Sequence, residues 1–479
     1  MKAYENLYIN GAWVPPVGGK GSLDVIDSST EEVMATVAQG GAADVDLAVA
    51  AARDAFDSWS QTPVDVRAKY VRDIGAGLTA RFADIAATIS GEVGSPKGFA
   101  EMVQAGLSVG DWETYARIAE EFEWETQVGN SLVVREPIGV VGCVTPWNYP
   151  LYLIVCKIGP ALAAGCTIVL KPASYTPLNA IILTEVIHEV GLPAGVFNLV
   201  IGPGGEVGEA IAKHPDVDMV SLTGSGPVGA QVSKDAADTV KRVGLELGGK
   251  SANIVLDDAD PATVAMGAVF SCFLNSGQTC SALTRLLVPR SREQEFIDAI
   301  VAEASLCKLV DPHADEPDIF HAFGPMVSRS QQETVRNYIQ TGIDEGAQVV
   351  VGGPEQPEGF DKGFYVKPTV FAGVTPEMTI AQEEIFGPVL SIIAYEDDDD
   401  AVRIANGTVF GLAGGVQSAD VERAKAVARR LRTGQVDING APFNTEAPFG
   451  GYKQSGNTRE RGRWGLEEFL ETKSIQLPV

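Results

Sequence analysis

The sequence predicts an α/β protein of two or three structural units, and three observations support this class. First, the chain has 479 residues, which exceeds the length that a single hydrophobic core usually supports. Second, from about Val140 to Gly249 short apolar runs typical of strands alternate with amphipathic helical stretches. Third, the alternation restarts after Lys250 and continues to about Asn439. This pattern is typical of parallel sheets covered by helices.

The expected elements follow the chain in a regular order. Residues before Val140 are expected to be mostly helical, over 45–60 and 66–90, with a hairpin over 122–137. A buried helix and strand are expected within 149–170. In the first unit the other strands are expected over 139–144, 196–202, 219–225 and 242–249, and the other helices over 178–191, 206–214 and 228–236. In the second unit a helix is expected over 262–275 and a strand over 284–289.

Two local features refine this plan. The acidic residues 396–400 precede a helical stretch and suit a helix N-terminus, whose dipole favours negative charge. No linker rich in Pro, Gly or Ser separates the two units, so a tight turn near Gly248 and Gly249 should bring them together. Clefts between closely packed units are common ligand sites.

Composition excludes several classes of function. The chain has 36 Lys and Arg against 63 Asp and Glu, and a net charge of −27 disfavours nucleic acid and anionic membranes as partners. The longest apolar stretch contains Lys157 and Pro160, so it is a poor membrane span. The amino terminus has no apolar signal core and the six cysteines show no close-spaced framework, so we expect a reducing cytoplasm. The four histidines form no metal-binding pattern, so no metal site is expected.

Cys280 lies in a polar turn, NSGQTCS, that follows an apolar helical run. Small and polar neighbours suit a loop whose backbone amides can approach a bound anion, which makes Cys280 a candidate nucleophile. One cysteine in a polar turn is by itself more often incidental than catalytic. Because histidines are scarce, the proton acceptor of such a nucleophile would be a carboxylate or a water.

Three further patterns supply candidate partners, each with an ordinary structural alternative. Residues 223–229, TGSGPVG, follow a strand, open a helix and match a phosphate-binding turn, but a structural βα turn looks the same. Glu246 ends the fifth strand, where desolvation would make it a base near neutral pH rather than a ribose-binding acid, but a strand-end acid with its hydrogen bonds satisfied looks the same. Asn148 is fixed between Pro146 and Pro150, where it could donate to an oxyanion or simply cap a turn.

Seven motifs together resemble the aldehyde dehydrogenase superfamily, in the family's order and over nearly the whole chain. They are PWNYP (146–150), KPAS (171–174), TGSGPVG (223–229), LELGGK (245–250), GQTC (277–280), EEIFGPV (383–389) and PFGGYKQSG (448–456). The resemblance implies a modified Rossmann NAD(P)-binding domain from residues 1–118 and 138–249 and a second α/β catalytic domain over 250–455. It also implies a small β oligomerisation element from 119–137 and 456–479, and a homodimer or homotetramer.

The resemblance implies a role for each candidate catalytic residue. The sulfur of Cys280 attacks the aldehyde carbon, and the amide of Asn148 with the backbone N–H of Cys280 holds the oxyanion. Glu246 activates the water that hydrolyses the thioester. Lys157 and Glu460 resemble the family's proton-relay positions.

The resemblance also implies the cofactor contacts. Lys171 is placed on the adenine ribose, Glu384 on the nicotinamide ribose and Phe386 against the nicotinamide. The other implied positions surround the pyrophosphate turn and its neighbours: Pro146, Trp147, Ser174, Gly204, Thr223, Gly224, Ser225, Val228, Gly229 and Leu247. Many NAD-preferring members carry a glutamate where this chain has Ser174, and that carboxylate would repel a 2′-phosphate. We therefore expect NAD or NADP to serve.

The implied substrate pocket contains aromatic, aliphatic and small residues and no Arg or Lys. Its members are Tyr149, Tyr152, Leu153, Cys156, Leu274, Ser281, Phe443 and Phe449, whereas Phe273 is expected in the core. A carboxylated substrate needs a cation to pair with it, so the pocket predicts a neutral aromatic or medium-chain aliphatic aldehyde.

Three other functions compete with this prediction. One is a semialdehyde dehydrogenase with a carboxylated substrate. Another is a coenzyme-A-acylating dehydrogenase, which has little need of a hydrolytic base such as Glu246. A non-enzymatic scaffold is the last, and the joint presence of Cys280, Asn148 and Glu246 argues against it.

Overall fold

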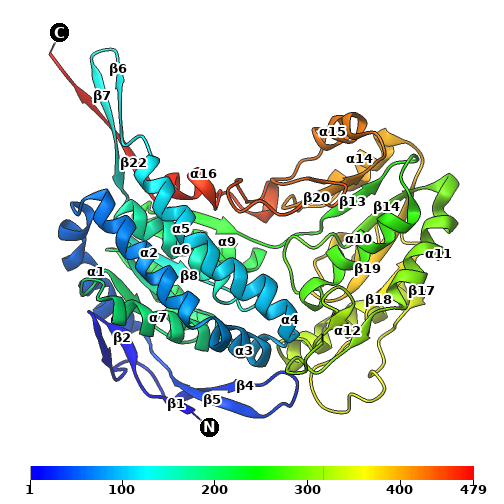
Figure 1. The fold of residues 1–479 in the computed structure, drawn as a ribbon, viewed down its shortest axis with the longest axis horizontal. Helices are drawn as coiled ribbons and strands as arrows, with labels where there is room; N and C mark the ends of the chain where they lie inside the picture. Colours follow the sequence, from blue (N-terminus) through cyan, green and yellow to red (C-terminus); the bar gives the residue numbers. More distant parts are fainter. Residues whose placement is uncertain (1, 317, 479) are drawn as a thin grey trace.

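Two seven-stranded sheets, one in each half of the chain, form the frame of the protein (Figure 1). The computed structural model describes residues 2–316 and 318–478. The first sheet has the order β12 (Arg242–Glu246), β11 (Met219–Thr223), β8 (Val140–Val144), β9 (Thr167–Lys171), β10 (Phe197–Leu199), β2 (Leu7–Ile9) and β3 (Ala12–Val14). The first five strands are parallel, and β2 and β3 form an antiparallel hairpin at one edge. Every residue of β8, β9 and β11 is buried, as parallel strands covered on both faces require.

Helices pack on the first sheet and on each other. They are α1 (Ala42–Ser60), α2 (Val64–Ala80), α3 (Phe82–Val93), α4 (Lys97–Phe99), α5 (Gly106–Glu121), α6 (Tyr152–Ala164), α7 (Leu178–Val190), α8 (Glu209–Lys213) and α9 (Gly226–Ala236). α1 contacts β9, and α2 packs against both α5 and α7. α6 is buried along its whole length, including Lys157. A buried cation in an apolar helix requires a hydrogen-bonded partner.

The second sheet has the order β17 (Gln348–Val351), β18 (Thr369–Ala372), β19 (Val389–Tyr395), β14 (Arg285–Pro289), β13 (Ala252–Val255), β20 (Gly414–Gln417) and β21 (Asp437–Ile438). Only the β17–β18 pair is antiparallel among the described strands of this sheet. Its helices are α10 (Pro261–Phe273), α11 (Glu293–Ala304), α12 (Arg329–Asp344), α13 (Thr379–Gln382), α14 (Asp398–Asn406) and α15 (Val421–Ala428), and a short pair, β15 (Lys308–Leu309) and β16 (Ala322–Phe323), lies outside the sheet. The predicted α/β class with two parallel-rich sheets is confirmed.

A small antiparallel sheet projects from the first half of the molecule (Figure 1). Its strands are β6 (Glu125–Val128), β7 (Ser131–Pro137) and β22 (Leu470–Gln476), and β22 is preceded by α16 (Gly462–Glu467). β22 pairs with β7 over its full length, from Leu470 opposite Pro137 to Gln476 opposite Ser131. The hairpin expected over 122–137 is therefore present, and the carboxyl-terminal strand extends it.

The amino-terminal region differs from the expectation that it is mostly helical. Its first 38 residues contain the β2–β3 hairpin and a three-stranded sheet of β1 (Lys2–Tyr4), β5 (Val33–Ala38) and β4 (Ser22–Ile26). These strands have three to six residues each, too short for an apolar period to show in the sequence. By contrast, the acidic run does begin a helix: Asp397 caps α14 and accepts a hydrogen bond from the backbone of Asp400.

Candidate active site

Cys280 follows a strained turn at the end of α10. Three successive residues of this turn, Asn275, Ser276 and Gly277, have left-handed φ angles of 51°, 58° and 74°. Left-handed backbone is unfavourable for residues with a Cβ, so it persists where the surroundings hold it, and such strain clusters at functional sites. A Cβ at Gly277 would lie 2.1 Å from the carbonyl carbon of Gly387, so only glycine fits there.

Buried hydrogen bonds hold this turn in place. The Asn275 amide donates to Asn148 O (3.0 Å) and to Gln278 O (3.3 Å). Its Oδ1 accepts from Ser95 Oγ (2.6 Å) and Gln104 Nε2 (3.1 Å). This network was not predicted, because Ser95 and Gln104 lie 180 and 171 residues from Asn275 along the chain. The only signal in the sequence was the polar character of the residues before Cys280.

Asn148 lies directly against the turn that carries Cys280. Its Nδ2 donates to Gln278 O at 2.9 Å, and the next residue, Tyr149, shares a 2.9 Å hydrogen bond with Thr279 Oγ1. Asn148 follows β8 of the first sheet, whereas Thr279 and Cys280 precede β14 of the second, so the contact crosses between the two halves. An amide group carries two N–H donors, and Gln278 O accepts from one of them.

The thiol of Cys280 has a low acidity in this environment. The residue is only partly exposed, and burial of the thiol raises its pKa to about 12. The negative charges of Glu384 and Glu246 raise this pKa further, whereas Arg461 and the backbone N–H of Ser281 lower it. The thiolate is the nucleophilic form, so attack by Cys280 at neutral pH requires a base that accepts its proton.

Glu246 is a buried carboxyl at the end of β12. It is 3% exposed, and neither side-chain oxygen has a hydrogen-bond partner among residues 2–316 and 318–478. Burial raises its pKa well above the usual range and the charge of Glu460 raises it further, while Lys157, Arg459 and Arg461 lower it. Once deprotonated, such a carboxylate is a strong proton acceptor.

Lys157 and Glu460 form a buried ion pair next to Glu246. Lys157 Nζ lies 2.6 Å from Glu460 Oε1, and the two side chains are 0% and 8% exposed. Lys157 also donates to Ser221 Oγ at 3.1 Å. Because the charges of both residues act on the pKa of Glu246, these three side chains form one electrostatic unit.

The carboxyl ends of the parallel strands bring the predicted cofactor residues to one edge of the first sheet. Thr223 ends β11 and Lys171 ends β9, and the Gly224-Ser225 turn leads into α9. Thr223 Oγ1 is buried and lacks a partner within the described ranges, so a ligand hydroxyl or phosphate can bond to it. In such sheets ligands bind outside the carboxyl ends of the strands and helix N-termini favour phosphates, so this edge fits a dinucleotide.

Several predicted cofactor residues are tightly packed at this edge. Lys171 is 4% exposed and burial lowers its pKa to about 8. Ser174 Oγ donates to Gly202 O at 3.0 Å. Gly204 begins a π-helical turn, Gly204–Gly208, and Val228 is 47% exposed on α9. A Cβ at Gly229 would lie 2.7 Å from Leu247 Cδ2, so glycine lets α9 approach this residue closely.

Glu384 and Phe386 reach this edge from the second half of the chain. Glu384 Oε1 accepts from Gly249 N at 2.8 Å, and burial raises the pKa of its carboxyl to about 7. A Cβ at Gly248 would lie 2.2 Å from Glu384 Oε2, so that glycine is required for the approach. Phe386 has a left-handed φ of 59°, and its ring meets that of Trp147 edge to face at 5.3 Å.

Most of the predicted substrate pocket is a buried cluster beside Cys280. Phe99, Tyr149, Tyr152, Leu153 and Cys156 pack together, and Leu274 borders them. Phe449 is 7% exposed and Phe443 is 43% exposed, and their rings lie 6.5 Å apart. Ser281 is partly buried at the turn. Phe273 is fully buried against Phe323, as expected of a core residue.

A cation that was not among the predicted pocket residues lies close to three of them. Arg461 is 5% exposed, and its guanidinium carbon lies over the rings of Phe443, Phe449 and Tyr152. Arg461 was not predicted as a pocket residue because it lies after the 448–456 motif, next to Glu460.

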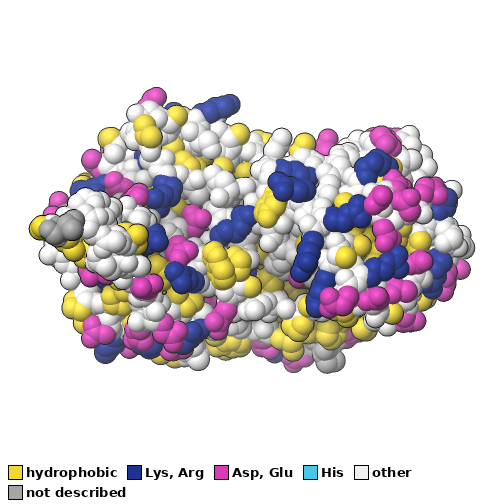
Figure 2. Space-filling view, turned by 90° about the horizontal axis from the view of Figure 1, so that it is seen from above, with side chains coloured by type: hydrophobic (Ala, Val, Ile, Leu, Met, Phe, Trp, Pro, Cys, Tyr) yellow, Lys and Arg dark blue, Asp and Glu magenta, His cyan; other side chains and the backbone are white. Residues whose placement is uncertain are grey.

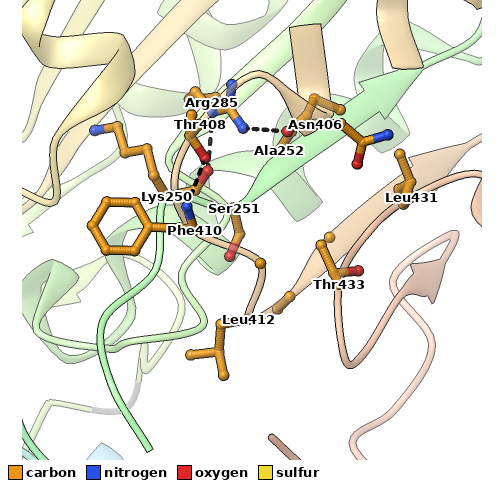
Figure 3. A pocket seen from close by; sticks show the side chains of 14 residues that line it. Lys250, Ser251, Ala252, Arg285, Asn406, Thr408, Phe410, Leu412, Leu431 and Thr433 are labelled. Carbon is orange, nitrogen blue, oxygen red and sulfur yellow. Dashed lines mark hydrogen bonds between the residues drawn. The ribbon is translucent and has the colours of Figure 1, made fainter. Parts of the chain in front are cut away.

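Lys250 and Arg285 are among the residues that line a small cavity (Figure 3). Arg285 donates to the carbonyl oxygens of Lys250, Ile404 and Ala405 at 2.8–3.0 Å, which fixes the loops around it. The cavity volume of about 10 Å³ has room for about one water, so it cannot hold a substrate. Burial lowers the pKa of Lys250 to about 7, and its charge lowers the pKa of Glu384.

The surface carries mixed charge on the face shown in Figure 2. Acidic and basic side chains are interspersed over both halves, and hydrophobic side chains appear near the middle. No helix within the described ranges is long and apolar enough to cross a bilayer. In the same ranges no group of three or more His, Cys, Asp or Glu side chains could hold a metal ion.

Comparison with known proteins identifies relatives over the full length of the chain. The family described as "Aldehyde dehydrogenase family" matches residues 13–475. A 3-succinoylsemialdehyde-pyridine dehydrogenase from Pseudomonas is 47% identical over 479 residues, 99% of each chain.

Solved structures agree with the sequence comparison. A mutant of aldehyde dehydrogenase C from Pseudomonas syringae, in complex with NAD+ and octanal, is 47% identical with a TM-score of 0.96, covering 98% of this chain and 96% of that one. An aldehyde dehydrogenase from Mycobacterium tuberculosis in complex with NAD+ is 44% identical with a TM-score of 0.95, covering 100% and 99%.

Proposed function

The chain belongs to the aldehyde dehydrogenase family and is an oxidoreductase that acts on aldehydes, and from this premise we propose that it oxidises its aldehyde to the carboxylic acid through a covalent intermediate on Cys280. One observation carries the proposal: Asn148 bonds to the carbonyl of Gln278, two residues before Cys280, while the charge of Glu246 acts on the Cys280 thiol. Nucleophile, oxyanion donor and base thus belong to one site.

The first half of the reaction forms an acyl-enzyme. A water molecule in the site accepts the proton of Cys280, and the thiolate sulfur adds to the aldehyde carbon, which leaves a negative charge on the aldehyde oxygen. The free N–H of Asn148 and the backbone N–H of Cys280 stabilise that oxygen. The tetrahedral carbon then loses a hydride and the C–O double bond re-forms, so that the acyl group remains on sulfur as a thioester. NAD, when bound, accepts the hydride on its nicotinamide ring.

The second half releases the product. Glu246 takes a proton from water, and the hydroxide adds to the thioester carbonyl carbon. The C–S bond breaks, the carboxylic acid leaves, and the sulfur takes up the proton that Glu246 removed from water, which re-forms the Cys280 thiol. Lys157 and Glu460 lie beside Glu246 and can exchange a proton with it, since one of them donates and the other accepts.

The cofactor is NAD or NADP. Two similar enzymes are NAD+ complexes, and the unpartnered Thr223 Oγ1 and the helix N-terminus of α9 fit a pyrophosphate here. Ser174 brings no carboxylate to this region, and its hydroxyl already bonds to Gly202 O. No negative charge at that position opposes a 2′-phosphate, so NADP is accepted as well.

For the wider arrangement we propose the division that the resemblance implies. Residues 1–118 and 138–249 bind the cofactor, 250–455 carry the nucleophile, and 119–137 with 456–479 join subunits into a dimer or tetramer. β6 is an exposed edge strand that a second copy can extend. Six free cysteines fit a reducing cytoplasm.

The aromatic and aliphatic wall accepts an aldehyde with an apolar body, either aromatic or medium-chain aliphatic. The octanal bound by the Pseudomonas syringae relative supports this choice. A semialdehyde substrate is the second candidate, favoured by the guanidinium of Arg461 in the same wall. Coenzyme A acylation is disfavoured, because a thiol acceptor has no need of the buried base Glu246.

Rapid-quench kinetics tests the mechanism. Glu246→Gln should give one equivalent of reduced cofactor per site and then stall, because the thioester forms but is not hydrolysed. Cys280→Ser should abolish both the burst and turnover. A Cys280→Ser enzyme that oxidises aldehydes at the parent rate would overturn the proposal.

A further inference from the structure

Arg461 is a buried cation in the aromatic wall beside Cys280. Its guanidinium carbon lies 3.9 Å, 4.7 Å and 5.1 Å from the ring centroids of Phe443, Phe449 and Tyr152. Ring faces attract a cation, but they do not replace the hydrogen-bond acceptors that its five N–H groups need.

The N–H groups of Arg461 have spare capacity. Nε and Nη1 are buried without a hydrogen-bond partner among the residues that the structure describes. No ion pair within 4.0 Å joins Arg461 to a described carboxylate. Buried charges in proteins are normally paired and hydrogen-bonded, so this guanidinium suits an acceptor that comes from outside the chain.

The groups around the guanidinium leave its charge only partly balanced. Tyr152, Cys156 and Tyr115 lie near the guanidinium, but burial raises their pKa, so they are neutral at neutral pH and do not balance its charge. Asp111, on α5, is the carboxyl among the groups near Arg461 here, and its Oδ2 is buried without a partner within the described ranges. Burial raises the pKa of Asp111 and the charge of Arg461 lowers it, so the two groups interact without forming an ion pair within 4.0 Å.

Arg461 shares the site of the nucleophile. Its positive charge lowers the pKa of both Cys280 and Glu246, so it lies within electrostatic reach of them. Its backbone has a left-handed φ of 74°, a strained conformation for a large side chain. The preceding residue, Glu460, is held by its ion pair with Lys157. The position of Glu460 therefore helps to direct the next side chain, Arg461, toward the aromatic rings.

From this geometry we infer that Arg461 is a specificity-determining residue that binds an oxygen acceptor at the far end of the substrate. The substrate is then an aldehyde with an apolar middle and a second oxygen group, a ketone or a carboxylate, that accepts from the guanidinium. This inference deepens the proposed function and rests on it. Both oxygen groups offer the same chemistry to Arg461, and the experiment separates them.

Three aldehydes of equal chain length provide the test: hexanal, the keto-aldehyde with its ketone next to the terminal methyl group, and the semialdehyde of adipic acid. For the unmodified enzyme we expect kcat/KM for at least one oxygen-bearing aldehyde to exceed that of hexanal about tenfold to a hundredfold, as a hydrogen bond to a charged group would give. Preference for the semialdehyde identifies a carboxylate ligand, and preference for the keto-aldehyde identifies a ketone.

Variants assign the preference to the guanidinium. Arg461→Leu should bring the ratio of oxygen-bearing aldehyde to hexanal close to one, and Arg461→Lys should restore part of it. Arg463→Leu is the matched control, because Arg463 is exposed and pairs with Glu467, and this variant should keep the parent ratio. A ratio unchanged in a folded Arg461→Leu enzyme overturns the inference.

The inference stays testable if Arg461→Leu does not fold. Adipate should then protect the unmodified enzyme against alkylation of Cys280 at least tenfold better than hexanoate if a carboxylate is the ligand, and the corresponding keto-acid should do so if a ketone is the ligand. Equal protection by all three, or an equal kcat/KM for all three aldehydes, overturns the inference while the proposed function stands. Failure to oxidise any aldehyde would instead count against the proposed function.

Discussion

The buried pair of Lys157 and Glu460 gives a sharp test of how Glu246 is tuned. Glu460→Gln removes the negative charge and preserves the shape of the side chain. Lys157 Nζ then loses the negative charge of its partner at 2.6 Å, and only neutral acceptors remain, the amide oxygen of the new side chain and Ser221 Oγ at 3.1 Å. Breaking a buried ion pair destabilises a protein by about 3–5 kcal/mol. We therefore expect the thermal unfolding midpoint to fall.

The same substitution lowers the pKa of Glu246. The charge of Glu460 raises that pKa and the charge of Lys157 lowers it. After the substitution the raising charge is gone and the lysine is no longer neutralised, so both changes act in one direction. An effect on the order of one pKa unit corresponds to about 1.4 kcal/mol. Because Glu246 works as a base when deprotonated, the rising limb of the pH profile of thioester hydrolysis should move to lower pH.

The pH dependence of the deacylation rate, measured after a single turnover, checks this expectation. Glu467→Gln is the matched control, since Glu467 pairs with Arg463 at the surface and its loss should leave the profile in place. The double substitution of Lys157→Met with Glu460→Gln removes both charges and should regain part of the stability. A folded Glu460→Gln enzyme whose profile stays fixed or moves to higher pH refutes the reasoning.

Three further predictions follow from single contacts. Ser174→Glu should raise the ratio of kcat/KM for NAD to that for NADP at least tenfold, because a carboxylate repels the 2′-phosphate; a parent enzyme with no detectable NADP activity at saturation would contradict this. Asn148→Ala should lower kcat by about 10²–10³ in single-turnover assays, as loss of an oxyanion donor does elsewhere, and a change of less than threefold would exclude that role. Gly277→Ala should destabilise the chain by about 1–3 kcal/mol or more and lower kcat, because its Cβ would lie 2.1 Å from the carbonyl carbon of Gly387; unchanged thermal unfolding and activity would show that the turn tolerates a side chain.

The parts of the fold that the sequence predicted are those with long, regular patterns. Strands such as 140–144 and 167–171 are continuous apolar runs because they are covered on both faces, and this pattern is visible without coordinates. The amino-terminal strands were missed because they have only three to six residues each, too few to show a period. Their pairing depends on partners far along the chain, as β2 pairs with β10, and a local pattern does not reveal it.

The same distinction holds within the site. Cys280, Asn148 and Glu246 were predicted because each belongs to a motif with its own chemistry. Ser95 was missed because its role is to hold Asn275 across 180 residues of sequence. Arg461 was missed for a related reason: its neighbours in the chain are Glu460 and Gly462, whereas its neighbours in space are aromatic rings, and only the fold brings those together.

Arg461 also connects substrate choice to catalysis. Its positive charge lowers the pKa of both the Cys280 thiol and the Glu246 carboxyl. A carboxylate bound to the guanidinium would neutralise that charge, so both pKa values would rise when such a substrate binds. A smaller fraction of Glu246 would then be deprotonated at neutral pH, and the Cys280 thiol would also become harder to ionise. A ketone ligand leaves the charge in place, so for a carboxylated substrate both thiolate formation and thioester hydrolysis should require a higher pH than for a keto-aldehyde.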